Sequence, residues 1–132
     1  MRYVYNLALH DNTSDGEENF DIGFFSSREK AQETAEKFLN ETDGFKDGDF
    51  SGIITEKKLI GCEDGAKYDE VYVIYGYNVN ENGDTIDIIT SECLTENADV
   101  EGLFEKMKEE YVREYWGIDD YIIDECQWEE GI

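Results

Sequence analysis

Internal repetition constrains the fold of this chain more than any other feature of the sequence. Val4-Tyr5 and Val71-Tyr72 correspond at a shift of 67 residues, and the polar stretches 11–16 (DNTSDG) and 78–83 (NVNENG) correspond at the same shift. Ile53-Ile54 and Tyr121-Ile122 correspond at a shift of 68. Landmarks that hold one spacing to within a residue predict a tandem duplication.

Each copy has the pattern strand, strand, helix, strand. Apolar and aromatic runs predict strands over 3–9, 20–25 and 52–59 in the first copy, and over 70–77, 85–91 and 120–128 in the second. Polar turns that contain glycine join the first two strands of each copy into a β-hairpin.

A helix follows each hairpin. In the first copy Ser26 and Glu29 form a capping box, followed by a helical stripe of Ala31, Ala35, Phe38 and Leu39. In the second copy we expect Thr95 to cap the helix and Gly117 to end it. The apolar stripe of this second helix comprises Val100, Leu103, Phe104, Met107 and Tyr111.

These elements predict one α+β domain over 1–132. It consists of a β-β-α-β repeat at 1–60, a connector at 61–69 and a second repeat at 70–132, giving about six strands, two helices and a pseudo-two-fold arrangement. Hydrophobic residues make up 39% of the chain and aromatic residues 14%, which is enough for a core. One such repeat buries little alone, so the two copies are expected to share that core.

The first copy also contains the segments 21–31 (DIGFFSSREKA) and 44–52 (GFKDGDFSG). Over about 3–60 it resembles a family of small bacterial and phage β-β-α-β proteins of unknown function. The resemblance implies a fold and no activity, and the second copy departs from it, with Cys93, Leu94 and Thr95 where serines are expected. The matching residues are Ile22, Gly23, Phe25, Ser26, Ser27, Glu29, Lys30, Ala31, Gly44 and Phe45.

Negative charge limits the possible partners. The chain has 34 acidic and 11 basic residues, for a net charge of −23. Residues 1–66 carry −8 and residues 67–132 carry −15. Such a surface repels phosphates and anionic membranes, so we expect neither direct nucleic-acid binding nor membrane binding.

The second predicted helix and the segment after it hold a row of carboxylates. Neighbours on a helix face lie about 5–6 Å apart, comparable to successive phosphates of one nucleic-acid strand. Composition and size resemble the acidic DNA-mimic inhibitors of the anti-restriction and anti-CRISPR class, which are small and phage-borne. We therefore expect a non-enzymatic inhibitor that occupies the basic surface of a DNA- or RNA-binding protein, for example a nuclease complex. The residues expected to bind this partner are Glu101, Glu105, Glu109, Glu110, Glu114, Asp119 and Asp120.

A second hypothesis remains open. The chain could be a housekeeping protein-interaction module that binds a peptide at a sheet edge, with its acidity serving only solubility. Monomer and dimer are both compatible with the sequence.

The two polar stretches also begin like EF-hand loops, which makes Asp11, Asp15, Asn78 and Asn82 weak candidates for metal ligands. Position twelve of such a loop must be a bidentate Glu, but it is Ile22 in one copy and Ile89 in the other. We expect hairpin loops here and no metal.

Catalytic and cofactor motifs are missing from the sequence. His10 is the single histidine, and Cys62, Cys93 and Cys126 lie in no recognisable nucleophile or metal motif. A Cys-His pair using His10 remains the one open catalytic arrangement. We expect no enzyme activity, no cofactor, reduced thiols and a cytoplasmic location, since no signal peptide or transmembrane run is present.

Overall fold

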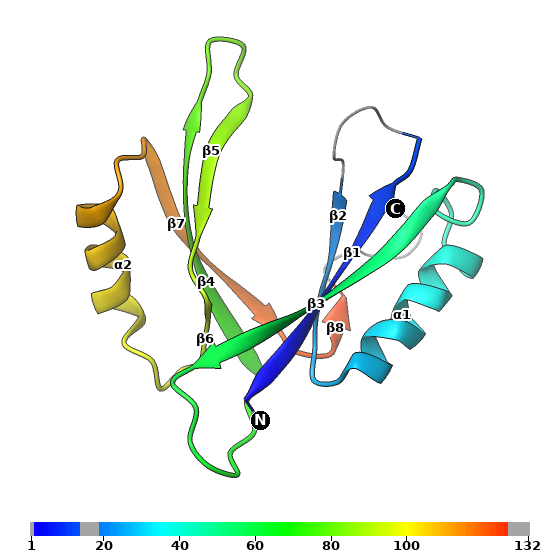
Figure 1. Cartoon of the computed structure of the whole chain (residues 1–132), viewed down its shortest axis with the longest axis horizontal. Helices are drawn as coiled ribbons and strands as arrows, with labels where there is room; N and C mark the ends of the chain where they lie inside the picture. Colours follow the sequence, from blue (N-terminus) through cyan, green and yellow to red (C-terminus); the bar gives the residue numbers. More distant parts are fainter. Residues whose placement is uncertain (1, 14–18, 127–132) are drawn as a thin grey trace. The chain divides into compact units, whose positions relative to one another are not determined.

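The computed structural model of the chain describes residues 2–13 and 19–126. Over these ranges the protein is α+β, with two helices and eight strands (Figure 1). The helices are α1 (Arg28–Glu41) and α2 (Val100–Glu110). The strands are β1 (Tyr3–Asp11), β2 (Asn19–Phe25), β3 (Phe50–Ile60), β4 (Glu70–Val79), β5 (Thr85–Thr90), β6 (Cys93–Leu94), β7 (Tyr115–Ile122) and β8 (Glu125–Cys126).

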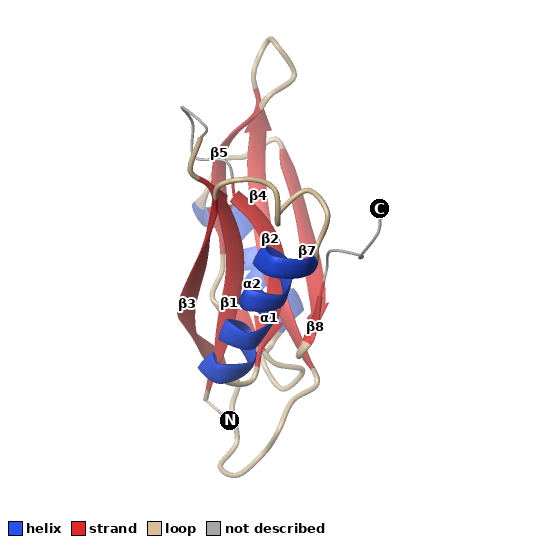
Figure 2. Cartoon of the chain, turned by 90° about the vertical axis from the view of Figure 1, so that its right-hand side faces the viewer, coloured by secondary structure: helices blue, strands red, loops and turns tan. Residues whose placement is uncertain are grey.

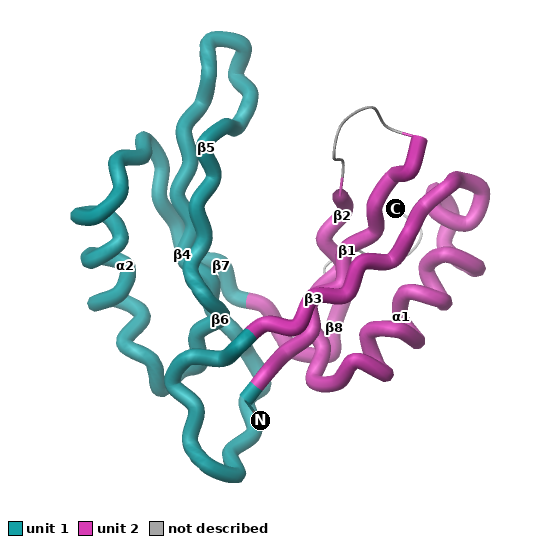
Figure 3. The backbone as a smooth tube through the Cα atoms, viewed as in Figure 1, with its two compact units in different colours: residues 1–2, 58–120 teal, residues 3–57, 121–132 magenta. Residues whose placement is uncertain are grey.

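The chain forms two compact units (Figure 3). Unit 1 comprises residues 1–2 and 58–120, and unit 2 comprises residues 3–57 and 121–132. The strands β3 and β7 each contribute residues to both units. No helix in the described part of the chain is long and apolar enough to cross a membrane.

Unit 2 is a sheet with the strand order β3-β1-β2-β8, on which α1 packs (Figure 2). β1 and β2 are antiparallel, with Tyr5 opposite Phe25 and His10 opposite Asn19. The predicted stripe on α1 is confirmed, because Ala31, Ala35 and Phe38 are buried. They form one buried cluster with Leu7, Leu9, Ile22, Phe25 and Phe45.

The cap of α1 differs from the prediction by one residue. Ser27, and not Ser26, is the N-cap, and its side chain accepts a hydrogen bond from the Lys30 amide at 3.1 Å. Ser26 instead bonds to Asp124, nearly a hundred residues further along the chain. Two adjacent serines offered two possible caps, and the distant carboxylate determines which one the helix uses.

In unit 1, β4 pairs antiparallel with β5 and also pairs with β7. The short strand β6 lies parallel to the end of β3, with Leu59 opposite Cys93, and antiparallel to β4, with Tyr72 opposite Leu94. β6 was not predicted, since a two-residue strand has no recognisable periodicity, and the single strand predicted over 120–128 is interrupted by a turn at 123–124 that separates β7 from β8. The fully buried side chains of this unit include Val71, Ile74, Leu94 and Thr95.

The prediction for the second helix was wrong at both ends. Asp99, not Thr95, is the N-cap and accepts a hydrogen bond from the Gly102 amide at 3.0 Å. Thr95 is buried and donates to the Gly61 carbonyl at 2.7 Å. The helix ends at Glu110, and Gly117 lies inside β7.

The local sequence favours the early end of α2. Residues 111–118 (YVREYWGI) are rich in aromatic and β-branched residues, which favour strands. Of the predicted stripe, the four residues Val100, Leu103, Phe104 and Met107 are half-buried, whereas Tyr111 is 40% exposed beyond the helix. β7 therefore starts at Tyr115, whereas the predicted strand started at Asp120.

The first strands of the two units bury equivalent positions. Val4, Leu7 and Leu9 are buried in β1, and the residues 67 positions later, Val71, Ile74 and Gly76, are buried in β4. In each unit the strand after the helix lies beside the first strand of the hairpin, in the orders β3-β1-β2 and β7-β4-β5.

Asp124 holds the end of the described chain onto unit 2. Its carboxylate accepts hydrogen bonds from the Ser26 amide at 2.8 Å, the Ser26 hydroxyl at 2.8 Å and the Lys30 ammonium at 3.0 Å. Its own amide donates to the Phe24 carbonyl at 2.8 Å. Burial raises the pKa of Asp124, but the bonds from Ser26 and Lys30 outweigh it, so this pKa lies below its ordinary value.

We predict that Asp124→Asn lowers the free energy of unfolding by about 1–2 kcal/mol at pH 7, because charge-assisted bonds to a partly buried carboxylate are lost. A lowered folded-state pKa contributes stability that is present above the unfolded value of about 3.9 and lost as pH falls through the folded value. Urea denaturation of both proteins between pH 7 and pH 3 measures this difference, which should shrink below about pH 4.

Asp64→Asn is the matched control. Asp64 pairs with Arg2 at 2.9 Å, but the two side chains are 94% and 75% exposed, so this change should alter stability by less than about 0.5 kcal/mol. Equal effects of the two substitutions at pH 7 contradict the role assigned to Asp124.

Candidate functional site

Four of the seven predicted partner-binding residues lie on α2. Glu101, Glu105, Glu109 and Glu110 are all exposed. Three of them, at positions 101, 105 and 109, are spaced four residues apart along the helix, as predicted. Because i and i+4 side chains share a helix face, these three form one row of negative charge.

The other three residues do not continue this row. Glu114 follows the helix in the connection to β7, and its amide donates to the Asn78 side chain at 2.9 Å. Asp119 and Asp120 are adjacent in β7, so they point to opposite faces of the sheet. All three are exposed, but the expectation that Glu114 extends the helical row was wrong because α2 ends at Glu110.

Few cations lie close to the row on α2. Lys108 is 3.8 Å from Glu105 and also lies over the Phe104 ring, 5.0 Å from its centroid. In the described chain, Glu105 is the only one of the four α2 glutamates recorded within ion-pair distance of a basic group. The four glutamates therefore outnumber the two lysines of the helix, Lys106 and Lys108.

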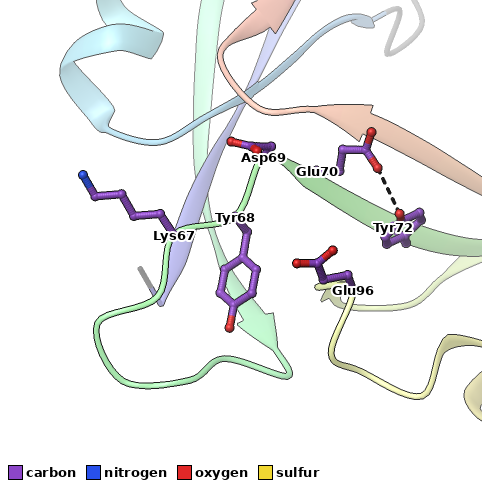
Figure 4. Close-up of a pocket in the computed structure, with 6 residues that line it drawn as sticks. All are labelled: Lys67, Tyr68, Asp69, Glu70, Tyr72 and Glu96. Atoms are coloured by element: carbon purple, nitrogen blue, oxygen red, sulfur yellow. Dashed lines mark hydrogen bonds between the residues drawn. The ribbon is translucent and has the colours of Figure 1, made fainter.

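An open pocket of about 290 Å³ lies where the connector enters β4 (Figure 4). It is lined by the residues Lys67, Tyr68, Asp69, Glu70, Tyr72 and Glu96. Of these, Tyr68 is buried, and its hydroxyl accepts a bond from the Glu63 amide at 2.8 Å. Three carboxylates against one ammonium make this pocket suitable for a positively charged group and unsuitable for a phosphate.

The Tyr72 hydroxyl donates to the Glu70 carboxylate at 2.9 Å (Figure 4). This bond, together with the negative charge of Glu70, raises the pKa of Tyr72 above its ordinary value of 10.0. The neutral phenol is thereby favoured as a hydrogen-bond donor.

We predict that Glu70→Gln lowers the Tyr72 pKa towards 10, because the substitution removes the charge that disfavours the phenolate. NMR titration of the ring-carbon signal of Tyr72 measures this pKa. The signal of Tyr115 serves as an internal control, and a Tyr72 pKa unchanged by the substitution contradicts the assigned cause.

The weak metal candidates do not form a site in the described chain. Asp11 accepts bonds from the Thr13 amide and hydroxyl at 2.9 and 2.7 Å, as in a hairpin turn. Asn78 lies on β4, where its side chain bonds to Asp87 and to the Glu114 amide, and Asn82 lies in the turn that follows. Asp15 lies outside the described residues, among which no three His, Cys, Asp or Glu side chains group as metal ligands.

The open Cys-His arrangement finds no support within unit 2. His10 Nδ1 lies 2.8 Å from the Asn19 side-chain oxygen. Cys126 is opposite Gly23, four residues further along β2, which corresponds to about 13 Å of strand. Cys93 is buried, Cys126 is exposed, and the Cys62 thiol is 3.4 Å from the Leu59 carbonyl.

A tyrosine face on unit 1 was not predicted. We define it as Tyr75 and Tyr77 of β4 together with Tyr115 of β7. The rings of Tyr75 and Tyr77 stack with centroids 6.1 Å apart and an interplanar angle of 15°, and those of Tyr77 and Tyr115 stack at 5.2 Å and 21°. Alternation within β4 indicated that Tyr75 and Tyr77 share a face, but Tyr115, which is 38 positions after Tyr77, could not be placed beside them from the sequence.

Two glycines allow these strands to carry large rings on both faces. A Cβ on Gly76 would lie 2.8 Å from the Trp116 ring, and a Cβ on Gly117 would collide with Tyr75. Trp116 also meets Phe104 of α2 edge to face, with centroids 6.4 Å apart. Gly117 is therefore needed inside β7, because any larger residue there would collide with Tyr75.

We predict that Gly76→Ala lowers the free energy of unfolding by about 1–3 kcal/mol, because the added methyl group overpacks against Trp116. Thermal and urea denaturation measure the effect. In a double-mutant cycle, Trp116→Leu should relieve part of the penalty, whereas strictly additive effects contradict the proposed contact.

Comparison with known proteins returned no match: no family model, curated protein or solved structure is similar to this chain.

Proposed function

We propose that this protein acts by binding, without catalysis, and that the acidic surface of α2 occupies a basic, nucleic-acid-binding surface on another protein. The partner class is a DNA- or RNA-binding protein such as a nuclease complex. Inhibition of a defence system, of the anti-restriction or anti-CRISPR type, is the biological setting in which this action fits best, and the cytoplasm is the expected compartment.

The observation that carries the proposal is the row Glu101, Glu105 and Glu109 on a folded helix. These side chains are exposed, regularly spaced and mostly without cations nearby. Regular carboxylates on a fixed helix present a repeating negative charge to a cationic groove, which steers association and fixes register. Glu110, Glu114, Asp119 and Asp120 extend the negative field around the row.

The net charge supports the same conclusion. A value of −23 is roughly three times the upper end of the range of about 2–8 that keeps a small domain soluble. Like-charge neighbours on a helix cost about 0.2–0.5 kcal/mol per pair. A surface that costs stability beyond the need for solubility is better explained by a binding role.

The second candidate, peptide binding at a sheet edge, is favoured by one observation. β5 ends the strand order, and its Ile86 and Ile88 are 38% and 64% exposed. However, Asp87 has a positive φ of 53° within this strand, beside the irregular register between Gly76 and Asn78. Bulges and charges of this kind oppose the addition of another strand, so this candidate ranks second.

We predict that the protein displaces DNA-binding proteins from DNA. DNA-cellulose is loaded with bacterial lysate and eluted with the purified chain at low salt, and one eluted protein is then purified. Fluorescence anisotropy of labelled duplex DNA bound to that protein should fall as the chain is added. The neutralised variant Glu101→Gln/Glu105→Gln/Glu109→Gln should need at least tenfold higher concentration, because three of the contacting charges are lost.

The control variant removes the same number of negative charges from the other helix, α1. Glu29, Glu33 and Glu36 are exposed on α1, and their replacement by Gln should leave displacement within about twofold of the original protein. Polyglutamate at equal charge serves as a control for nonspecific polyanion effects. Equal activity of both variants, or of polyglutamate, contradicts the proposal.

We also propose that a tandem duplication is the origin of this fold. It is supported by the matching burial of β1 and β4 at a shift of 67 and by the common strand order in the two units. A pseudo-two-fold relation is the arrangement expected of such repeats. On this proposal the second copy developed the more negative helix, because α2 has four glutamates and two lysines whereas α1 has four glutamates and three basic residues.

A further inference from the structure

The tyrosine face of Tyr75, Tyr77 and Tyr115 lies on the opposite side of the unit 1 sheet from α2. Side chains alternate along a strand, so Tyr115 points away from the face occupied by its neighbour Trp116. Trp116 contacts Phe104 of α2, which places the helix on that other face. Because α2 is the one helix in the described part of unit 1, no helix of this unit covers the tyrosine face.

The rings on this face are accessible and parallel. Tyr115 is 50% exposed, and Tyr75 and Tyr77 are half-buried. Their near-parallel stacking differs from the edge-to-face packing of the rings in unit 2, such as Phe20 against Phe45 at 76°. Rings in edge-to-face contact cover part of one another, whereas the stack of the tyrosine face ends at Tyr115, which remains half exposed.

The surroundings of the rings are negative. Asp119 lies on the side of β7 that carries Tyr115 and is exposed, whereas Asp87, beside Tyr77 on β5, directs its carboxylate to the Asn78 side chain. Across residues 70–120 there are 14 acidic side chains and three basic ones. Of these three, Arg113 lies at the rim, where its guanidinium donates to the Asp87 and Val112 carbonyls.

Aromatic faces of this kind bind either nucleobases or cations. Base stacking accompanies binding of the phosphate backbone by a positive groove, and the negative charge here excludes it. A guanidinium, by contrast, stacks on an aromatic ring while its edge donates to carboxylates. A lysine ammonium has no flat surface to stack, so the combination of rings and carboxylates selects arginine.

We propose that the tyrosine face is a docking surface for arginine side chains of a basic protein segment. The inference rests on the proposed function, because it names the groups on the basic partner that this second surface recognises. Charge complementarity brings the segment to unit 1, and the stacked rings then distinguish arginine from lysine.

Isothermal titration with N-acetylated hexa-arginine and hexa-lysine peptides at low salt tests the proposal. Hexa-arginine should bind several-fold more tightly than hexa-lysine. Tyr77→Leu and Tyr115→Leu should each reduce hexa-arginine affinity by about two- to fivefold, the range of one exposed cation–π contact, and should reduce hexa-lysine affinity by less. Tyr77→Phe keeps the ring and should keep the preference for arginine.

Tyr3→Leu is the matched control, because Tyr3 is 45% exposed but lies in unit 2. NMR of the unmodified protein provides a second measurement that no folding defect can affect: hexa-arginine should shift the ring signals of Tyr77 and Tyr115 more than that of Tyr3. Equal affinity for the two peptides, or ring shifts no larger than that of Tyr3, overturns the inference.

The proposed function of the carboxylate row and the inference about the tyrosine face can be contradicted separately. The variant Glu101→Gln/Glu105→Gln/Glu109→Gln should bind both peptides more weakly and leave the ratio of the hexa-arginine and hexa-lysine affinities unchanged. If this ratio holds but the chain displaces no DNA-binding protein, the proposed function is wrong and the arginine surface stands. If displacement occurs and the peptides bind equally, the row acts alone and the inference is wrong.

Discussion

Mutual repulsion among 34 acidic side chains is the constraint to which the rest of this fold conforms. Within the described residues the buried polar side chains are Thr42 and Thr95, and no carboxylate is buried. Each unit is held by apolar packing, such as Leu7 against Phe38 in unit 2 and the buried Ile74 in unit 1. The ion pairs Arg2–Asp64, Lys46–Asp43 and Lys108–Glu105 contribute little, since they lie at the surface, where such pairs are worth at most about 1 kcal/mol.

The negative charge is divided almost equally between the two units. Unit 1 has 17 acidic and six basic residues, and unit 2 has 17 and five, so their net charges of −11 and −12 are nearly equal. The imbalance between the sequence halves disappears because the acidic segment 121–132 belongs to unit 2. Total charge therefore does not single out unit 1, whereas the row on α2 and the tyrosine face do.

Local patterns predicted much of this fold. The strands β1 to β5 and the helix α1 follow alternation or helical periodicity that one segment contains by itself. The end of α2 was missed because Trp116 packs on Gly76, a contact across 40 residues that favours a strand after Glu110. Ser26 was misassigned as a cap because its partner, Asp124, is 98 residues away.

Prediction of the candidate site was limited in the same way. Glu101, Glu105 and Glu109 were placed correctly on one helix because their spacing is local. Glu114, Asp119 and Asp120 depended on where that helix ends, which tertiary packing decides. The tyrosine face needed the pairing of β4 with β7, and pairing between distant strands leaves no signal in either strand alone.

The central claim is that the carboxylates of α2 contact a basic partner, and carboxyl footprinting tests it most directly. The complex with a protein eluted from DNA-cellulose is labelled with a carbodiimide and glycine ethyl ester, and the labelled positions are mapped by mass spectrometry. The account predicts that Glu101, Glu105 and Glu109 are protected in the complex, while Glu29, Glu33 and Glu36 on α1 label as in the free protein. Protection confined to α1, or unchanged labelling along α2 in a stable complex, would contradict it.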